Sequence, residues 1–444
     1  MEENNNTSRF TKFNEWIQRS VTIKLLSIGV LILILLIPAS MIETVIRERQ
    51  YARDAAITEV SSKWGEAQLV AGPILSVPYR KNIKNDKGKI VEIIEFFHCL
   101  PDSLGIEGVI RPERRYRGIY DVVVYNTELK LKGFFGAIDL KELNIDSADV
   151  IWEDARLNLG VTDMRGIQKS IELSWNTDTS VFDPGLSNTD VLESGVSTSV
   201  VIAENIEKFD FSLDLNLNGS GSIQFLPLGK VTTLGVNSTW QNPKFDGAFL
   251  PDSRNISEQG FTANWEVLHL NRNFPQKWIG NKHQVIYSSF GVNLLLPVDQ
   301  YQKSMRSAKY AIMFIALTFM ILFFTEILNR KRIHPFQYIL TGLALCIFYL
   351  LLISLSEHIG FNNAYLVSSI AIIAMVTLYA STIFKQKKLT LLTGGVIAIL
   401  YAFLFITLQL QDYALLMGSI GLFLVMGLVM YISRKVDWYK IAER

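Results

Sequence analysis

The segment Glu113–Arg117 concentrates three arginines, Arg114, Arg115 and Arg117, just before a strongly apolar stretch. Guanidinium groups bind carboxylates and phosphates through paired hydrogen bonds. The cluster is therefore a candidate contact for an anionic lipid head group, a peptidoglycan carboxylate or a protein partner. The alternative is a solvated strand end, at which the arginines form ordinary surface ion pairs with Glu113 and its neighbours.

A second candidate site lies in the apolar last third of the chain. Glu357 and His358 are adjacent, and Asp412 stands in another short polar interruption. A carboxylate beside a histidine can move protons near neutral pH, so an enzyme would use this pair on a lipid-linked substrate. The alternative is an interfacial polar loop that helps to cap a membrane helix.

Other known chemical patterns do not occur in the sequence. None of the five histidines forms an H-x-x-x-H pair or lies at ligand spacing from a cysteine, so we expect no metal and no cofactor. The net charge of +1 and the lack of a basic stripe with interleaved aromatics argue against nucleic acid. Asp163 and Arg165 flank Met164 before Gly166, and we expect them to bond locally in a turn.

Long apolar runs must position these residues. A membrane helix needs roughly 20 apolar residues, so the last run, Leu389–Ile432, is too long for one span and is divided at Gln409–Asp412. We expect a transmembrane helix at 25–42 and a bundle of five within 308–432, at about 310–328, 338–356, 364–384, 389–408 and 414–432.

Basic residues predict the orientation of these helices. The N-terminal tail (1–24), the loops near 329–335 and 385–388, and the C-terminal tail (433–444) are rich in lysine and arginine. The loops 357–363 and 409–412 contain neither. We therefore expect both termini in the cytoplasm and a large periplasmic domain. The first run is long for a signal peptide and lacks an A-x-A site, so we expect an uncleaved anchor.

Residues 43–68 contain no glycine or proline before Gly65. The pairs Glu43/Arg47 and Glu59/Lys63 are four apart, and Ile57, Val60 and Trp64 share one helical face. We expect an amphipathic connecting helix that packs this face on the soluble domain. A bare stalk is the alternative.

In residues 69–307 the apolar residues recur with a period of two. This pattern predicts a mostly antiparallel β-rich domain, a large sandwich. Phe209–Asn218 alternates strictly, and Asn218–Gly221 predicts a tight turn into a hairpin partner, Ser222–Phe225. Asp121–Tyr125 is continuously apolar after its first residue, as in a strand buried on both faces. Asn176–Ser199 is polar and carries Pro184-Gly185, so we expect a long surface loop or a sub-domain boundary.

Several motifs of mixed residue type follow one another along the chain. They are Leu100-Pro101, Arg114–Tyr120, Gly160–Ile167, Trp240–Pro251, Gly260–Trp265, Pro297–Tyr301, Lys309-Tyr310, His334–Tyr338, Phe348-Tyr349, Ser354–His358, Gln411–Gly418 and Arg434 with Asp437–Tyr439. In this order they resemble the CreD family of bacterial inner-membrane proteins.

This resemblance implies a protein of the bacterial inner membrane that supports cell-envelope integrity, with expression tied in some members to a two-component stress response. The family supplies no catalytic residues to carry over. We therefore expect a non-enzymatic protein whose periplasmic domain binds an envelope protein or lipid. The alternatives are a lipid-processing enzyme and a transporter. No charge lies in the middle of any expected span, and Glu326 stands near the inner end of the second, which disfavours ion-coupled transport.

Overall fold

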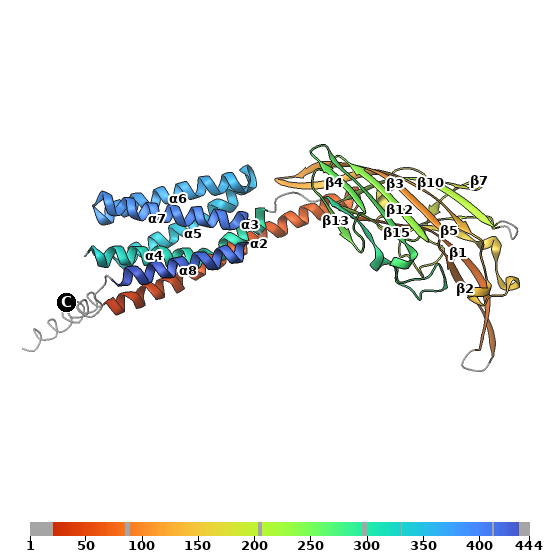
Figure 1. Ribbon diagram of the computed structural model, residues 1–444, viewed down its shortest axis with the longest axis horizontal. Helices are drawn as coiled ribbons and strands as arrows, with labels where there is room; N and C mark the ends of the chain where they lie inside the picture. Colours follow the sequence, from red (N-terminus) through yellow and green to blue (C-terminus); the bar gives the residue numbers. More distant parts are fainter. Residues whose placement is uncertain are drawn as a thin grey trace, which may run out of the picture. The chain divides into compact units, whose positions relative to one another are not determined.

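The computed structural model describes residues 21–84, 89–202, 207–294, 300–329, 331–410 and 413–434. The chain forms two compact units. We call Met1–Ala52 with Val298–Arg444 the membrane unit, and Arg53–Pro297 the β unit. Figure 1 labels the main helices and strands of both.

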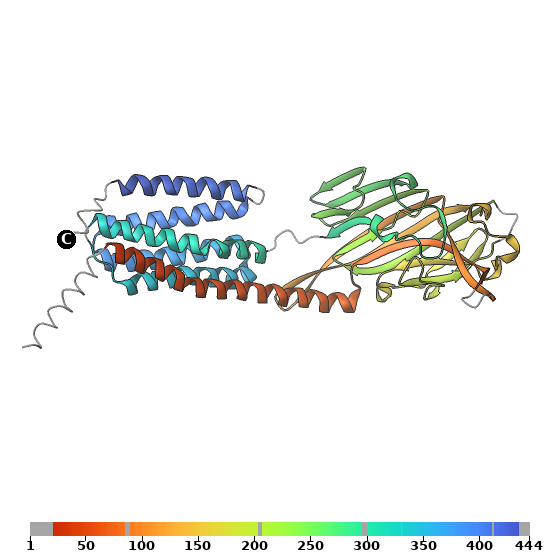
Figure 2. The same cartoon turned by 90° about the horizontal axis from the view of Figure 1, so that it is seen from below.

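The membrane unit is helical. Six helices of the described chain are long and apolar enough to cross a membrane. They are α2 (Val21–Trp64), α4 (Ala311–Leu328), α5 (Pro335–Ile359), α6 (Phe361–Phe384), α7 (Lys387–Gln409) and α8 (Ala414–Ser433), and the short α3 (Gln300–Lys309) precedes α4. Helices α4 to α8, cyan to blue, run side by side in Figure 2. The division of the last apolar run into two helices is confirmed.

Aromatic packing fixes the interior of the bundle. The Phe348 ring of α5 is fully buried and lies 5.4 Å from the Tyr365 ring of α6 and 4.7 Å from the Tyr401 ring of α7, centroid to centroid. The Tyr365 hydroxyl donates to the Tyr401 carbonyl at 2.7 Å. A buried tyrosine needs such an acceptor, so this contact holds α6 against α7.

Helix α2 belongs to both units, because its residues from Arg53 onward lie in the β unit. The Trp64 indole N–H at its end donates to the Tyr125 carbonyl at 3.2 Å. Ala56 and Ser61 are buried, and Ile57 is half-buried. Helix α2 thus covers most of the expected segment 43–68 and contacts the rest of the β unit, but it ends at Trp64, and Gln68 already lies in a strand.

The β unit contains two sheets. The nine-stranded sheet consists of β1 (Gln68–Lys84), β2 (Ile90–Cys99), β5 (Arg156–Val161), β8 (Asp183–Pro184), β9 (Gly195–Ser199), β11 (Ser222–Phe225), β13 (Pro243–Gly247), β16 (Lys277–Ile279) and β17 (Phe290–Leu294). The eight-stranded sheet has the order β14 (Ser253–Ser257), β15 (Gly260–Leu268), β12 (Val231–Ser238), β3 (Ser103–Arg117), β4 (Tyr120–Gly136), β10 (Lys208–Ser220), β6 (Glu172–Trp175) and β7 (Asp178–Val181).

Most pairings are antiparallel, as the alternating pattern predicts. Among the described strands, β1 with β11 and β12 with β3 are parallel. One apolar core takes side chains from both sheets, including Leu75 and Leu157 of the first and Leu131 and Leu215 of the second. The unit is thus a sandwich with the core between its sheets.

The expected hairpin is wrong. Strand β10 pairs with β4 and β6, whereas Ser222–Phe225 joins β1 and β17 in the other sheet. Gly221 has φ +71°, so the turn that the sequence predicts is present. It carries the chain from one sheet to the other, because a turn sequence does not specify which strand the next segment will meet.

The expectation for Asn176–Ser199 is also wrong in part. This stretch contains β7 and β8, and it ends in β9, whose residues Gly195–Thr198 are buried. Strand β9 pairs with β5 inside the nine-stranded sheet. The serine and threonine residues of this strand led to the prediction of a loop. Small polar side chains are tolerated in a strand where the backbone supplies the hydrogen bonds.

Candidate functional site

The arginines of the first candidate site lie at the end of strand β3, at its hairpin turn with β4. Arg117 binds Glu59 of α2 in a bidentate pair, with Nε to Oε2 and Nη2 to Oε1 both at 3.0 Å. Hydrogen bonds from Lys63 and Arg117 hold the pKa of Glu59 below its ordinary value. The Arg115 guanidinium carbon lies 3.7 Å from the centre of the Trp64 ring. Two of the three arginines thus hold the end of α2.

Arg114 faces the other way, because side chains alternate along a strand. Its guanidinium carbon lies 5.4 Å from the centre of the Trp240 ring. The three arginines therefore do not converge on one point. The contact of this cluster with an anionic ligand stays a prediction.

A denser polar cluster surrounds Asp163, a residue that the sequence singled out only as half of a local pair. Its buried carboxylate accepts from the backbone N–H of Glu66 at 2.9 Å, and from the Arg165 N–H at 3.1 Å and Nε at 2.8 Å. Burial alone would raise the pKa of Asp163, but these hydrogen bonds outweigh it and hold the pKa below its ordinary value.

Arg165 extends this cluster to the helix end. Its Nη1 donates to the Ser62 carbonyl at 2.6 Å and its Nη2 to Glu66 at 3.2 Å. The last carbonyls of a helix have no partner within the helix and carry partial negative charge, so an arginine there stabilises the C-terminus of α2. Asp163 and Arg165 do bond locally, as expected. Arg165 also binds Ser62 of α2, and Asp163 binds Glu66, just after the end of the helix.

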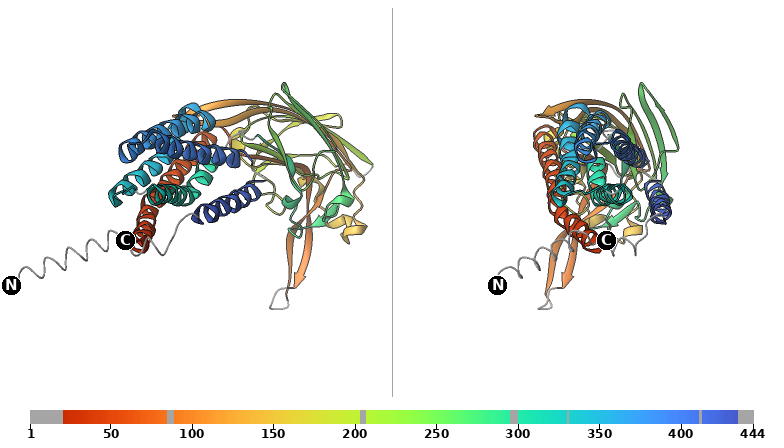
Figure 3. Two further views of the ribbon diagram at one scale, coloured as in Figure 1. Left: turned by 60° about the vertical axis from the view of Figure 1, so that its left-hand side comes forward. Right: turned by 90° about the vertical axis from the view of Figure 1, so that its left-hand side faces the viewer.

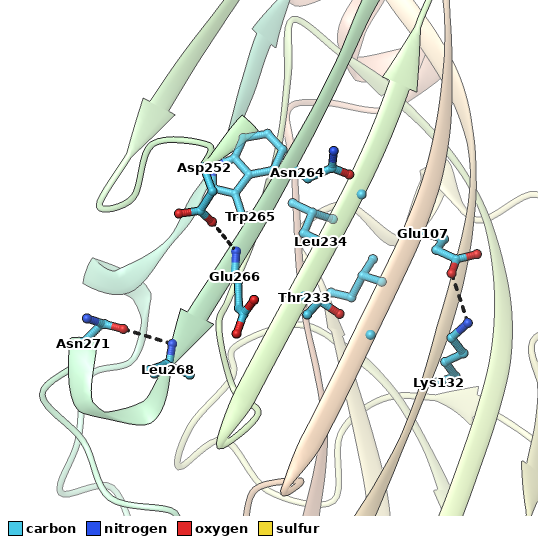
Figure 4. Close-up of a pocket in the computed structure, with 13 residues that line it drawn as sticks. Glu107, Lys132, Thr233, Leu234, Asp252, Asn264, Trp265, Glu266, Leu268 and Asn271 are labelled. Carbon is cyan, nitrogen blue, oxygen red and sulfur yellow. Dashed lines mark hydrogen bonds and ion pairs between the residues drawn. The ribbon is translucent and has the colours of Figure 1, made fainter. Parts of the chain in front are cut away.

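The open face of the eight-stranded sheet carries a polar groove (Figure 4), which the sequence alone did not predict. Two adjoining hollows of about 860 and 710 Å³ share Glu107, Gly235 and Asn264. They cross strands β15, β12, β3, β4 and β10. The lining side chains include five carboxylates and two amines: Glu107, Glu128, Asp214, Asp252, Glu266, Lys130 and Lys132.

Two glycines open the floor of this groove. Gly105 of β3 pairs with Thr233 of β12, and Gly235 of β12 pairs with Glu107 of β3. Both glycines occupy outward positions, where a side chain would fill the hollow. Glycine weakens a strand, so two such positions on neighbouring strands are informative. They are a weak sequence signal for the groove, which becomes informative once β3 and β12 are known to be neighbours.

The second candidate site lies at one end of the membrane unit. The Tyr301 hydroxyl of α3 donates to Glu357 at 2.9 Å, and Arg49 of α2 lies 4.0 Å from the same carboxylate oxygen. His358 is exposed at the end of α5. Asp412 lies outside the described residues. The structure thus brings Glu357 to Tyr301 and Arg49, and it does not bring His358 into that contact.

Glu326, which the sequence places near the inner end of the second span, is buried in the membrane unit. It is 3% exposed and pairs with Lys24 of α2. The Tyr338 hydroxyl donates to its Oε2 at 3.0 Å, and the Ile333 N–H donates to its Oε1 at 2.9 Å. These partners compensate the charge, so the carboxylate can be buried near the end of α4.

No group of three potential metal ligands occurs among the residues that the structure describes. The described features define the class: a multi-pass membrane protein with a large β unit between its first apolar helix and the other five.

The comparisons with known proteins agree with this class. The sequence model of the family described as Inner membrane protein CreD matches residues 20–439. The chain is also similar to the Inner membrane protein CreD of Escherichia coli (strain K12), with 31% identity over 424 residues, which are 94% of this chain and 93% of that protein. The chain therefore belongs to the CreD family of inner membrane proteins.

Proposed function

We propose that this protein supports cell-envelope integrity and the response to envelope stress, without catalysis, by binding an envelope component through the β unit. The observation that carries the proposal is the groove on the eight-stranded sheet. It offers amide, hydroxyl and carboxylate groups over a floor opened by Gly105 and Gly235. Such a surface suits a hydrophilic, neutral or cationic chain, because its excess of carboxylates repels anions.

The proposed topology places both termini in the cytoplasm and the β unit in the periplasm. The alternation of basic and non-basic loops supports it, because lysine and arginine are retained on the cytoplasmic side. The basic segments at 329–335 and 385–388 connect α4 to α5 and α6 to α7. The loops without basic residues connect α5 to α6 and α7 to α8.

The proposal is tested by complementation of a deletion strain with variants that fill the groove. Gly105→Val and Gly235→Val place β-branched side chains on outward strand positions. A Cβ at Gly235 would meet only the side chain of Asn264, at 3.2 Å, so the fold is expected to tolerate the change. We expect the doubly substituted protein to reach the membrane but not to restore the tolerance of the deletion strain to detergent and cell-wall antibiotics.

The matched control is Ser174→Val, an exposed outward position of β6 outside the groove. We expect this control to restore tolerance fully. If the deletion strain tolerates envelope stress as well as its parent, the envelope role is wrong. If the filled groove complements as well as the control, the envelope component binds elsewhere.

A further inference from the structure

A second surface of the β unit is a two-stranded ribbon formed by the distal parts of β1 and β2. It projects from the rest of the unit, in orange, in Figure 3. Arg80–Lys84 of β1 pairs with Ile90–Ile94 of β2. We call these two segments the ribbon. Among the described residues, the neighbouring strands β5 and β16 pair only with the proximal parts of β1 and β2.

The ribbon exposes aliphatic side chains. Ile90 is 69% exposed, Ile94 61%, Val91 41% and Ile83 38%. A lone two-stranded ribbon is at best marginally stable in water, and exposed branched side chains add to its cost. Several strongly exposed aliphatic side chains on one projecting element indicate a contact site.

The apolar residues occupy both faces of the ribbon. Residues directly opposite in an antiparallel pair share a face, so Ile83 and Val91 lie on one face. Ile90, opposite Lys84, and Ile94 lie on the other. A flat protein interface would cover one face only. The interfacial zone of a bilayer contacts both faces of an inserted ribbon. It also contains water, which can hydrate the unpaired backbone groups at the strand edges.

Cations accompany the aliphatic residues. Residues 80–84 and 89–95 contain two carboxylates, Glu92 and Glu95, and four cations: Arg80, Lys81, Lys84 and Lys89. Lys81 pairs with Glu95 at 2.8 Å and Arg80 with Glu92 at 3.9 Å. The four cations nevertheless exceed the two carboxylates by two charges. Aliphatic side chains flanked by cations match the acyl boundary and the phosphates of an anionic lipid surface.

We propose that the ribbon is a lipid-binding arm that inserts shallowly into the surface of an anionic phospholipid bilayer. The aliphatic side chains enter the interfacial zone, and the lysine and arginine side chains lie among the phosphates. This surface is separate from the groove, so a failure of either proposal leaves the other standing.

The experiment uses the full chain in nanodiscs of phosphatidylcholine, mixed with sucrose-loaded vesicles that contain 30% phosphatidylglycerol. Co-sedimentation measures the capture of nanodiscs, with empty nanodiscs as background. We expect capture that disappears with vesicles of pure phosphatidylcholine. Ile90→Asn with Ile94→Asn should weaken apparent affinity about tenfold or more. Arg80→Gln with Lys84→Gln should weaken it about 25-fold, since each cation near an anionic surface contributes about a fivefold factor.

Matched controls change the same kinds of residue elsewhere on the β unit. Leu270→Asn with Ile286→Asn alters two aliphatic side chains that are also strongly exposed, and Lys169→Gln with Lys230→Gln removes two exposed cations. Both controls should bind as the unmodified chain does. Hydrogen exchange of β1 and β2 near Phe97 should be the same in all variants, which verifies the fold. The absence of capture by anionic vesicles, or equal capture by ribbon variants and controls, would overturn the proposal.

Discussion

Removal of the Asp163 carboxylate should loosen the end of α2 from the sheets within the β unit. In Asp163→Ala, the N–H groups of Glu66 and Arg165 lose their acceptor at a partly buried site. A hydrogen bond to a charged group contributes about 1.5–3 kcal/mol, and an unsatisfied buried donor costs a similar amount. The Arg165 side chain is 57% exposed and can be rehydrated, which limits the loss. We therefore expect local opening to become easier by about 3 kcal/mol.

Hydrogen exchange followed by mass spectrometry on the full chain in nanodiscs measures this local free energy. A change of 3 kcal/mol corresponds to roughly 100-fold faster exchange for peptides that cover Glu66–Val70 and Gly160–Arg165. Asp163→Asn, which keeps one acceptor oxygen, should show an intermediate effect. Asp210→Ala removes a surface pair with Lys208 and should leave these peptides unchanged. Acceleration of less than threefold in Asp163→Ala would refute the proposed role of Asp163.

The contribution of Asp163 to folding stability should also depend on pH. Its pKa in the folded protein is lower than in the unfolded chain, so folding is stabilised by the ionised carboxylate. That stability is complete above the unfolded pKa of about 3.9 and is lost as the pH falls through the lower, folded value. The difference between Asp163→Asn and the unmodified chain should therefore disappear in strong acid.

Three further predictions concern other buried groups of the β unit. Burial raises the pKa of Cys99 to about 12, so iodoacetamide at pH 8 should leave this thiol unmodified until the protein is denatured. Burial lowers the pKa of His98, although Asp190 nearby favours the charged imidazole. The stability that the neutral imidazole contributes is therefore complete above the ordinary pKa of 6.5 and decreases as the pH falls below that value. The thermal unfolding temperature should decrease between pH 7 and pH 5, and His98→Gln should lack this decrease. A Cβ at Gly166 would lie 2.3 Å from the Asn218 carbonyl oxygen, so Gly166→Ala should lower the free energy of unfolding by about 3 kcal/mol in denaturant titrations, and an unchanged midpoint would contradict the close approach.

The membrane helices could be predicted because their signal is local. Each run is apolar over its own length, and the interruption at Gln409–Asp412 separates α7 from α8 without reference to distant residues. The docking of α2 was predicted for the same reason, from a periodic face and from the pair Glu59/Lys63, which lies at 2.9 Å. These inferences need no knowledge of which strands meet.

The arrangement of the β unit depends on contacts between distant segments. Asn218–Gly221 has the same turn chemistry whether the next strand folds back or crosses to the other sheet, so the hairpin prediction failed. The cluster around Asp163 joins residues about 100 positions apart, for which no local pattern exists. The groove had a weak signal, Gly105 and Gly235 at outward positions, which becomes informative only when β3 and β12 are known to be neighbours.

The most direct test of the account is the side of the membrane on which the β unit lies. In a chain with Cys99 and Cys346 replaced by alanine, Asn237→Cys marks the groove and Lys387→Cys marks the first residue of α7, next to its connection with α6. A membrane-impermeant maleimide added to intact spheroplasts should label position 237 at once and position 387 only after the membrane is disrupted. Labelling of position 387 in intact spheroplasts, with position 237 protected, would contradict the account.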